Sequence, residues 1–275
     1  MKNSEQIKSK VREKYSQIVE DEGVGCGCAC GCGPDITSDS ESDYSIFSEN
    51  YENLDGYNPD ADLSLGCGIP TEFAGIKAAH TVVDLGSGAG NDCFVARSIV
   101  GEKGEVIGVD MTREMIKKAR DNAKKTGYKN VKFRLGEIEN LPVTSNKADV
   151  VISNCVLNLV PDKHAAFNEI IRVLKPGGHF TISDVVTRGQ IPEKLREQAE
   201  LYAGCVAGVI EKEDYLSIIR DTGFLDIQVH KEKPVEMPDS LVKSFLSDEE
   251  FKIYQSADLG IFSMTVSAMK PKSCC

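Results

Sequence analysis

The 275-residue sequence predicts an α/β fold built on a mostly parallel, doubly wound sheet. From Thr81 onward, short runs of β-branched and other apolar residues alternate with longer segments of helical periodicity. A glycine-rich turn follows the first run, and Pro176 with the next two glycines ends a helical segment before another run. Strands that alternate with helices in this way form βαβ units, which place helices on both faces of a parallel sheet.

The individual elements follow from these patterns. Residues 4–20 carry apolar side chains at helical spacing and predict a short amphipathic helix. Residues 190–232 are expected to hold a helix, a loop, a second helix and a final strand near 225–229, and residues 233–275 a smaller appendage. Between them we expect strands at 81–85, 106–110, 131–135, 149–153 and 180–184, and helices at 91–100, 114–126 and 163–174.

Charge and composition exclude several classes of protein. The formal net charge of -11 argues against a nucleic-acid partner, which would require a basic face, and disfavours anionic membranes. The N-terminus lacks the apolar core of a signal peptide, and no run approaches the roughly 18 apolar residues of a membrane span. We therefore expect a cytoplasmic protein. Ten cysteines in that reducing compartment indicate metal, metalloid or redox chemistry.

Four of these cysteines form a tract with an unusual spacing. Cys26, Cys28, Cys30 and Cys32 alternate with glycine and alanine, so an extended chain would place them on one face at intervals of about 6.6 Å. The tract lies in a segment between Lys14 and Lys77 that contains acids but no Lys or Arg, which predicts a solvated acidic linker. A linker that stays mobile so that the tract can move is the functional alternative.

The turn after the first predicted strand is a candidate cofactor site. Gly86, Gly88 and Gly90 would let the backbone approach a nucleotide-like ligand, and ligands bind at the carboxyl ends of such strands. Asp110 follows Gly90 by 20 residues, at the end of the second strand, where an acid can bind both ribose hydroxyls.

The surroundings of this turn favour S-adenosylmethionine over a dinucleotide. Asp84 and Asp92 suit a cationic sulfonium and amino group better than a pyrophosphate. The sequence from Asp84 through the turn and the sequence of residues 136–142 resemble class I, Rossmann-like methyltransferases, in which the residue after the third strand contacts the adenine. The cofactor-binding residues expected from the pattern and the resemblance are Asp84, Gly86, Ser87, Gly88, Gly90, Asp110, Met111, Glu137, Ile138 and Asn154.

Three further cysteines occupy distinctive contexts. Any one of Cys67, Cys155 and Cys205 alone would be read as a small buried hydrophobic residue. Their contexts, SLGCGIPTEFAGIK, SNCVLNLVPDK and GCVAGVIEKEDY, closely resemble arsenite methyltransferases, and the resemblance runs from about Gly66 to Phe224. It implies that these three cysteines bind trivalent arsenic beside the cofactor.

Thiolate ligands are chemically suited to that substrate. Soft sulfur donors select soft centres, and arsenic bound by three sulfurs keeps a lone pair that can attack the sulfonium methyl without losing a proton. We therefore expect neither a general base nor a metal cofactor, and we assign the histidines structural or surface roles. The substrate would be arsenite or its thiol conjugates.

The cysteine tract is expected to return electrons after methyl transfer. The resemblance implies disulfide exchange between an N-terminal cysteine region and Cys67. Our hypothesis is that the tract is a mobile thiol relay whose disulfide is reduced afterwards by thioredoxin or glutathione. Which of the four tract cysteines is the partner stays open, and so does a rival function as a zinc or copper(I) clasp. Cys93 is expected to serve packing. Cys274 and Cys275 are expected either to shuttle arsenic or reductant or to be a reactive end of no consequence, and we favour the latter.

Two function classes compete with arsenite methylation. A quinone-type or other small-molecule C-methyltransferase gives no reason for the three dispersed cysteines. A non-catalytic metalloid sink or sensor gives no reason for the cofactor residues.

We divide the chain into four regions. They are residues 1–65 (helix, cysteine tract and linker), 66–185 (S-adenosylmethionine-binding domain), 186–232 (arsenic-binding region) and 233–275 (C-terminal region).

Overall fold

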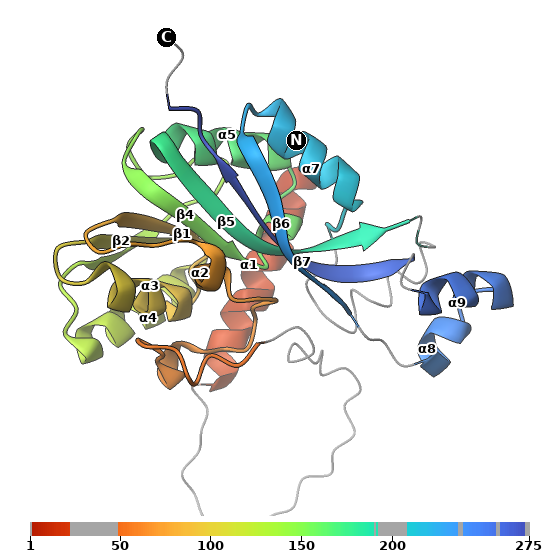
Figure 1. Cartoon of the computed structure of the whole chain (residues 1–275). Coiled ribbons are helices and arrows are strands. Elements are labelled where there is room, and N and C mark those ends of the chain that lie inside the picture. Colours follow the sequence, from red (N-terminus) through yellow and green to blue (C-terminus); the bar gives the residue numbers. More distant parts are fainter. Residues whose placement is uncertain are drawn as a thin grey trace, which may run out of the picture.

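The computed structural model describes residues 2–22, 49–189, 191, 208–235, 239–256 and 259–272. These residues form a seven-stranded sheet in the order β3-β2-β1-β4-β5-β7-β6, with helices on both of its faces (Figure 1). The first five strands in sequence are mutually parallel, and β7 runs antiparallel to both of its neighbours. The predicted α/β class with a mostly parallel sheet is confirmed.

The parallel half of the sheet forms close to where the sequence predicts it. Each boundary lies within one residue of the expected position, because strands buried on both faces form continuous apolar runs that end at charged or turn residues. The elements are β1 (Thr81–Leu85), α3 (Asn91–Val100), β2 (Glu105–Asp110), α4 (Arg113–Thr126), β3 (Val131–Leu135), β4 (Ala148–Asn154) and α5 (Lys163–Val173).

The next strand, β5 (Leu174–Arg188), is longer than the expected strand at 180–184. It begins directly after α5 and includes the Pro-Gly-Gly sequence, which coincides with an irregularity in its pairing to β4 between Leu174 and His179. The proline and glycines therefore interrupt the ladder and do not form a separate loop.

The C-terminal region differs most from expectation. After α7 (Lys212–Asp221) and β6 (Leu225–Pro234), the strand β7 (Gly260–Met269) inserts between β5 and β6 and is largely buried. Residues 233–275 are thus not a separate appendage: α8 (Asp239–Lys243) and α9 (Asp248–Gln255) lie to one side of the sheet, while β7 belongs to its core (Figure 1). The first helix expected in 190–232 lies largely outside the described residues.

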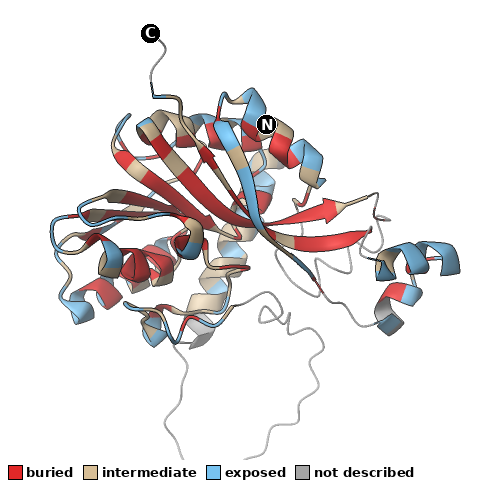
Figure 2. Ribbon diagram, in the orientation of Figure 1, coloured by how far each residue is buried: buried red, intermediate tan, exposed pale blue. Residues whose placement is uncertain are grey.

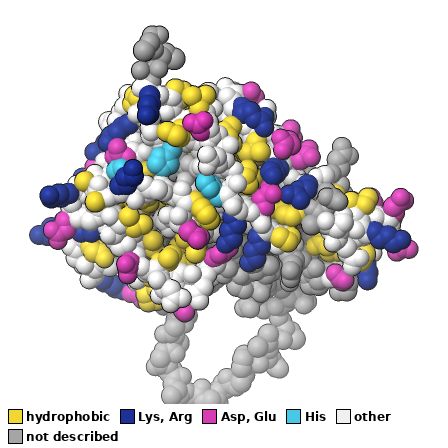
Figure 3. Space-filling view, in the orientation of Figure 1, with side chains coloured by type: hydrophobic (Ala, Val, Ile, Leu, Met, Phe, Trp, Pro, Cys, Tyr) yellow, Lys and Arg dark blue, Asp and Glu magenta, His cyan; other side chains and the backbone are white. Residues whose placement is uncertain are grey.

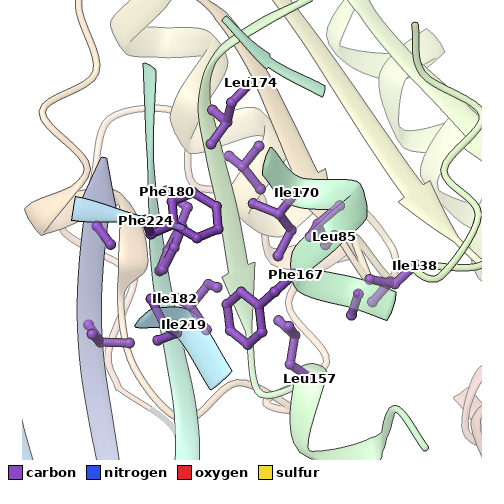
Figure 4. Close-up of a cluster of buried hydrophobic side chains, with 14 of the residues drawn as sticks. Leu85, Ile138, Leu157, Phe167, Ile170, Leu174, Phe180, Ile182, Ile219 and Phe224 are labelled. Carbon is purple, nitrogen blue, oxygen red and sulfur yellow. The ribbon is translucent and has the colours of Figure 1, made fainter. Parts of the chain in front are cut away.

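The hydrophobic core lies on both faces of the sheet. Figure 2 shows buried residues along the central strands and exposed ones along the edge strand β6. On the face covered by α5 and α7, Phe224 meets both Phe167 and Phe180 edge to face, with 4.8 Å between the ring centroids of Phe180 and Phe224 (Figure 4). A second cluster lies under α3 and α4. The sheet is therefore a rigid platform for groups at its carboxyl edge.

The N-terminal part of the chain is joined to this platform. α1 (Lys2–Glu22) confirms the predicted helix and packs along α4. The 3-10 helix η2 (Pro59–Ala61) and α2 (Pro70–Phe73) precede β1. In the described part of the predicted acidic linker, Glu52, Asp55 and Asp60 are exposed as expected, whereas Tyr51 is only 5% exposed and packs against the fold.

Surface charge is mixed on the face seen in Figure 3, where Lys and Arg side chains are interspersed with Asp and Glu. None of the helices within the described ranges combines the length and the apolar character needed to cross a lipid bilayer.

Candidate active site

A pocket opens at the carboxyl ends of β1, β2 and β4, where the sequence predicts the cofactor site. It contains about 1170 Å³ of space not filled by protein atoms, including the part open to solvent. Of the ten predicted cofactor residues, those that line it are Asp84, Gly86, Ser87, Gly88, Asp110, Met111, Ile138 and Asn154.

The glycine turn has a backbone that favours glycine. Gly86, Gly88 and Gly90 have φ values of 68°, 50° and 103°, in the left-handed region that other residues rarely adopt. A Cβ atom on Gly86 would lie 2.4 Å from a methyl group of Val156. Gly90 caps the N-terminus of α3 and does not itself line the pocket. The turn thus keeps the backbone close to the space that a ligand would fill.

Asp110 is held in place by the same turn. The backbone N–H of Gly88 donates to one carboxylate oxygen at 3.0 Å, and that of Thr112 donates to the other at 2.8 Å. Burial raises the pKa of Asp110, and these hydrogen bonds oppose the shift. The carboxylate therefore has a fixed orientation at the end of β2, as binding of a ribose would require.

Two more buried acids give the pocket an unbalanced negative character. Burial, with the repulsion of Asp92, raises the pKa of Asp84 well above its usual range. Burial also raises the pKa of Asp92 to about 6, against hydrogen bonds from Asn154 and Tyr51. The thiol of Cys93 donates to Asp84 at 3.2 Å, a contact that the sequence interpretation of Cys93 as packing missed. A cationic ligand would stabilise both carboxylates in their charged form.

Two buried polar atoms of the pocket have no hydrogen-bond partner among the described residues. They are Oγ of Ser87 and Oδ1 of Asn91, and both residues line the pocket. Buried polar groups normally have partners, so these atoms indicate a ligand. Together with the acids and the glycine turn, they fit S-adenosylmethionine, which is cationic and carries ribose and adenine groups.

The residues that follow β3 lie in two different environments. Ile138 is buried and lines the pocket, whereas the carboxylate of Glu137 forms ion pairs with Lys8 at 2.7 Å and Arg12 at 3.1 Å. Glu139 also pairs with Lys8, at 2.9 Å. Contact of Glu137 with adenine therefore stays a prediction, and its side chain is engaged by α1.

α1 forms one wall of the pocket through Lys8, Val11 and Tyr15. The helix (red in Figure 1) crosses the molecule at this edge of the sheet. The sequence predicted the helix but not its position, because the contacts join residues more than 100 positions apart. None of the four histidines lines the pocket.

The structure brings Cys67 and Cys155 together beside the pocket. Both are buried, at 1% and 2% exposure, and belong to one cluster of buried side chains. The N–H of Cys67 donates to the side chain of Asn154, the neighbour of Cys155, at 2.9 Å. Cys155 lines the pocket and has a φ of 59°, an uncommon conformation for a residue other than glycine, which is typical of functional positions.

Cys205 and the tract cysteines Cys26, Cys28, Cys30 and Cys32 lie outside the described residues, as do Cys274 and Cys275. The residues that flank the segment of Cys205 are described: Ile191 and Val209 belong to the same buried cluster as Cys67 and Cys155. The ammonium group of Lys163 donates to the carbonyl of Gly208 at 2.9 Å. The described residues on both sides of that segment therefore belong to the cluster that contains the two described cysteines.

A buried acid near these cysteines was missed from the sequence. Burial raises the pKa of Asp184 to about 7, and Tyr215 donates a hydrogen bond of 3.0 Å to its carboxylate. Burial, Asp184, Cys67 and Cys155 together raise the pKa of Tyr215. No sequence pattern marked this pair, because one member is on β5 and the other on α7. Among the described residues, no group of three or more His, Cys, Asp or Glu side chains is arranged to hold a metal ion.

The strand order, the glycine turn and the acid after β2 define a class I methyltransferase, and a family model described as a methyltransferase domain matches residues 76–223. The solved structure of an arsenic(III) S-adenosylmethionine methyltransferase from Chlamydomonas reinhardtii superposes with a TM-score of 0.63 at 34% identity, over 76% of this chain and 69% of that one. The chain belongs to the family of arsenite S-adenosylmethionine methyltransferases, which confirms the resemblance seen in the sequence.

Curated relatives agree with this assignment. An arsenite methyltransferase from Halobacterium salinarum is 45% identical over 213 residues, which are 77% of this chain and 52% of that protein. The human arsenite methyltransferase is 40% identical over 152 residues, 52% of this chain and 40% of the relative. The chain thus spans about half the length of the curated relatives it matches.

Proposed function

We propose that the protein transfers methyl groups from S-adenosylmethionine to trivalent arsenic held by the thiolates of Cys67, Cys155 and Cys205. The observation that carries this proposal is the burial of Cys67 and Cys155 in one cluster of side chains, with Cys155 lining a pocket whose acids suit a cationic cofactor. S-adenosylmethionine supplies a methyl group on a sulfonium, a strong electrophile that needs no metal.

The protein would accelerate this reaction mainly by orientation. Cys155 lines the pocket itself, so arsenic on its sulfur would lie at the border of the cofactor site. Three thiolates leave the lone pair of arsenic as the nucleophile, and a fixed approach of nucleophile to methyl can lower a barrier by several kcal/mol. The flanking residues of the Cys205 segment, Ile191 and Val209, support its place as the third ligand.

The serine variants of these cysteines test the proposal. Cys155→Ser and Cys205→Ser should each abolish methylation of arsenite, because an oxygen ligand is too hard for this centre. The assay follows S-adenosylhomocysteine and methylarsenicals from purified protein, arsenite, a dithiol and S-adenosylmethionine.

The matched control is Cys274→Ser combined with Cys275→Ser, which should keep wild-type turnover. Calorimetry should show that Cys155→Ser still binds S-adenosylmethionine, which would establish that the cofactor site is intact. Wild-type turnover in either ligand variant would contradict the proposal.

For the electron balance we propose a thiol relay. Methyl transfer to the lone pair converts As(III) formally to As(V), so two electrons must return, and two thiols supply them by forming a disulfide. Cys67 and one of Cys26, Cys28, Cys30 and Cys32 would form it, and thioredoxin or glutathione would reduce it. The segment that carries the tract lies between α1, whose Tyr15 lines the pocket, and Glu49, which also lines it.

Mass spectrometry after a single anaerobic turnover tests the relay. A disulfide between Cys67 and the tract is the expected product. Tightly bound zinc in place of a disulfide would support the clasp instead.

A quinone-type C-methyltransferase is the alternative within the same fold. A UbiE protein of ubiquinone and menaquinone biosynthesis from Azotobacter vinelandii is 34% identical over 112 residues, 40% of this chain. That similarity covers less of the chain than that of the arsenite methyltransferases. Turnover of a quinone precursor without turnover of arsenite would favour this alternative.

The cytoplasmic location of the protein stays a prediction.

A further inference from the structure

The hydroxyl group of Tyr51 lies within hydrogen-bond distance of more acceptors than it has hydrogens to donate. The ring is 5% exposed, and the oxygen lies 3.0 Å from the carbonyl of Gly68 and 2.9 Å from a carboxylate oxygen of Asp92. Both neighbours are acceptors, and a tyrosine has one hydrogen to donate. The hydrogen therefore divides between the Asp92 carboxylate, which faces the cofactor pocket, and the loop that carries Cys67.

Asn154 is in the same situation. Its amide nitrogen lies 2.8 Å from the carbonyl of Gly68, 2.9 Å from the hydroxyl of Tyr51 and 3.1 Å from the second oxygen of Asp92. Its two hydrogens face these three acceptors. Its carbonyl oxygen accepts from the N–H of Cys67 at 2.9 Å, so the orientation of the amide acts directly on the backbone of that cysteine.

The Cys67 loop has little other freedom. A Cβ atom on Gly66 would lie 2.5 Å from the Asn154 nitrogen, and one on Gly68 would lie 2.6 Å from the Ser183 hydroxyl. Ser263 donates to the carbonyl of Cys67. Because the loop is so closely packed, a hydrogen bond gained or lost at Gly68 changes how firmly the thiol is positioned.

The charge of the pocket decides which acceptor obtains the shared hydrogens. A buried carboxylate without a counter-charge competes strongly for donors, and a cation beside it reduces that demand. A cationic ligand near Asp92 therefore releases hydrogens of Tyr51 and Asn154 to the Gly68 carbonyl and tightens the Cys67 loop. Loss of that cation has the opposite effect.

We propose that Tyr51 is a positioning residue that couples the two substrates: through Asn154 and Asp92 it fixes Cys67 when a cationic cofactor occupies the pocket. The arsenic part of this inference rests on the proposed function. After transfer the sulfonium has become a neutral thioether and only the amino group of the cofactor keeps a positive charge, so the hydrogens return in part to Asp92 and the Cys67 loop loosens, as release of product or disulfide exchange at Cys67 would require. By linkage, a ligand that fixes Cys67 also strengthens cofactor binding.

The test measures the reactivity of Cys67 in the absence of arsenic. Full-length protein is alkylated with iodoacetamide, and the rate of modification of the Cys67 peptide is followed by mass spectrometry. The rate is measured without ligand, with saturating S-adenosylmethionine and with saturating S-adenosylhomocysteine. In the wild type, S-adenosylmethionine should slow the alkylation by about fivefold, the effect expected for one additional hydrogen bond, and S-adenosylhomocysteine by less.

Tyr51→Phe keeps the ring and removes the shared hydrogen. Its dissociation constant for S-adenosylmethionine should stay within about threefold of wild type, since the proposed defect is in coupling and the change removes one hydrogen bond. At saturating cofactor the slowing at Cys67 should be lost. Tyr57→Phe, a tyrosine six positions away with its own partner Asp62, is the matched control and should behave as wild type.

Asp92→Asn provides a second variant, because a neutral side chain competes less for the shared hydrogens. Its Cys67 rate without cofactor should fall toward the rate of cofactor-bound wild type. Undiminished slowing by S-adenosylmethionine in Tyr51→Phe would overturn the proposal, and so would equal slowing by both ligands in the wild type. These experiments are carried out without arsenic. A wild-type protein that shows the coupling but does not methylate arsenite would therefore refute only the proposed function.

Discussion

At the scale of single residues, the pocket depends on positions that suit few amino acids. Gly86 combines a positive φ with a neighbour that leaves no room for a side chain. Asp92 combines burial with a charge that the described residues do not neutralise with a cation of their own. Both features are unfavourable for the free protein and become useful when a cationic ligand is bound, which is typical of functional sites.

Gly86→Ala separates steric contact from backbone strain. Gly101 has the same φ of 68°, but a Cβ atom added there would have no other atom within 4 Å, whereas one added to Gly86 would lie 2.4 Å from Val156. Gly101→Ala should lower the free energy of unfolding by about 1–3 kcal/mol, the cost of the backbone conformation alone, because its φ of 68° with a ψ of -168° is almost confined to glycine. Gly86→Ala should cost more and also weaken cofactor binding.

Denaturant unfolding and calorimetry measure the two effects. Val156→Ala added to Gly86→Ala should recover part of the loss, since it removes the clashing methyl groups. Equal destabilisation by the two alanine variants would show that contact with Val156 is unimportant.

Cofactor binding should depend on pH through Asp92. The raised pKa of about 6 means that the carboxyl group of the free protein is neutral below that pH and charged above it. Affinity for S-adenosylmethionine should therefore rise by about tenfold between roughly pH 5 and 7, as the charged fraction grows. Asp84, whose pKa is also raised, acts in the same direction.

Calorimetry across this range gives the profile. Asp92→Asn should bind more weakly at neutral pH and show a shallower dependence. A wild-type affinity that is constant from pH 5 to 7 would contradict the assignment of Asp92 to cation binding.

At the scale of elements, α1 is a wall of the site and not a separate extension. Lys8 is 13% exposed in its side chain and joins the helix to both Glu137 and Glu139. The helix is held by charge as well as by packing on α4. Because Val11 and Tyr15 also line the pocket, release of α1 would expose a bound cofactor to solvent.

Lys8→Ala should therefore raise the dissociation constant of S-adenosylmethionine by about threefold to tenfold, because it removes two partly buried ion pairs. Lys10→Ala, on the exposed face of the same helix, is the control and should leave the constant unchanged. Stopped-flow release of the cofactor should locate the effect in a faster dissociation. The role of α1 would be refuted if both variants bound as wild type does.

At the scale of the whole molecule, the C-terminal strand completes the sheet. β7 pairs along its length with β5 and with β6, so the last strand in the sequence connects the parallel half to the edge. β5 in turn carries Ser183, whose carbonyl accepts from the N–H of Cys155. The position of Cys155, a proposed arsenic ligand, thus depends through β5 on a strand more than 100 residues later in the chain.

Truncation tests this dependence. A chain that ends at residue 259 lacks β7 and should lose cooperative thermal unfolding, because the buried strand β5 would gain an unpaired edge and β6 would lose the strand with which it pairs. A chain that ends at residue 272 keeps β7 and should melt as the full-length protein does. Circular dichroism distinguishes the outcomes, and a cooperative transition in the shorter chain would show that residues 260–275 are dispensable.

The amino-acid sequence by itself determined the parallel half of the fold, the glycine turn, Asp110 and the family. These features depend on local patterns: a buried strand needs a continuous apolar run, and a tight turn at a ligand needs glycine within a few residues. The contexts of Cys67 and Cys155 were recognisable for the same reason.

The tertiary structure alone decided the rest. The insertion of β7, the position of α1 on the pocket, and the sharing of hydrogens among Tyr51, Asn154 and Asp92 join residues that lie far apart in the chain. Neither periodicity nor spacing records such contacts, because they depend on how completed elements pack against one another.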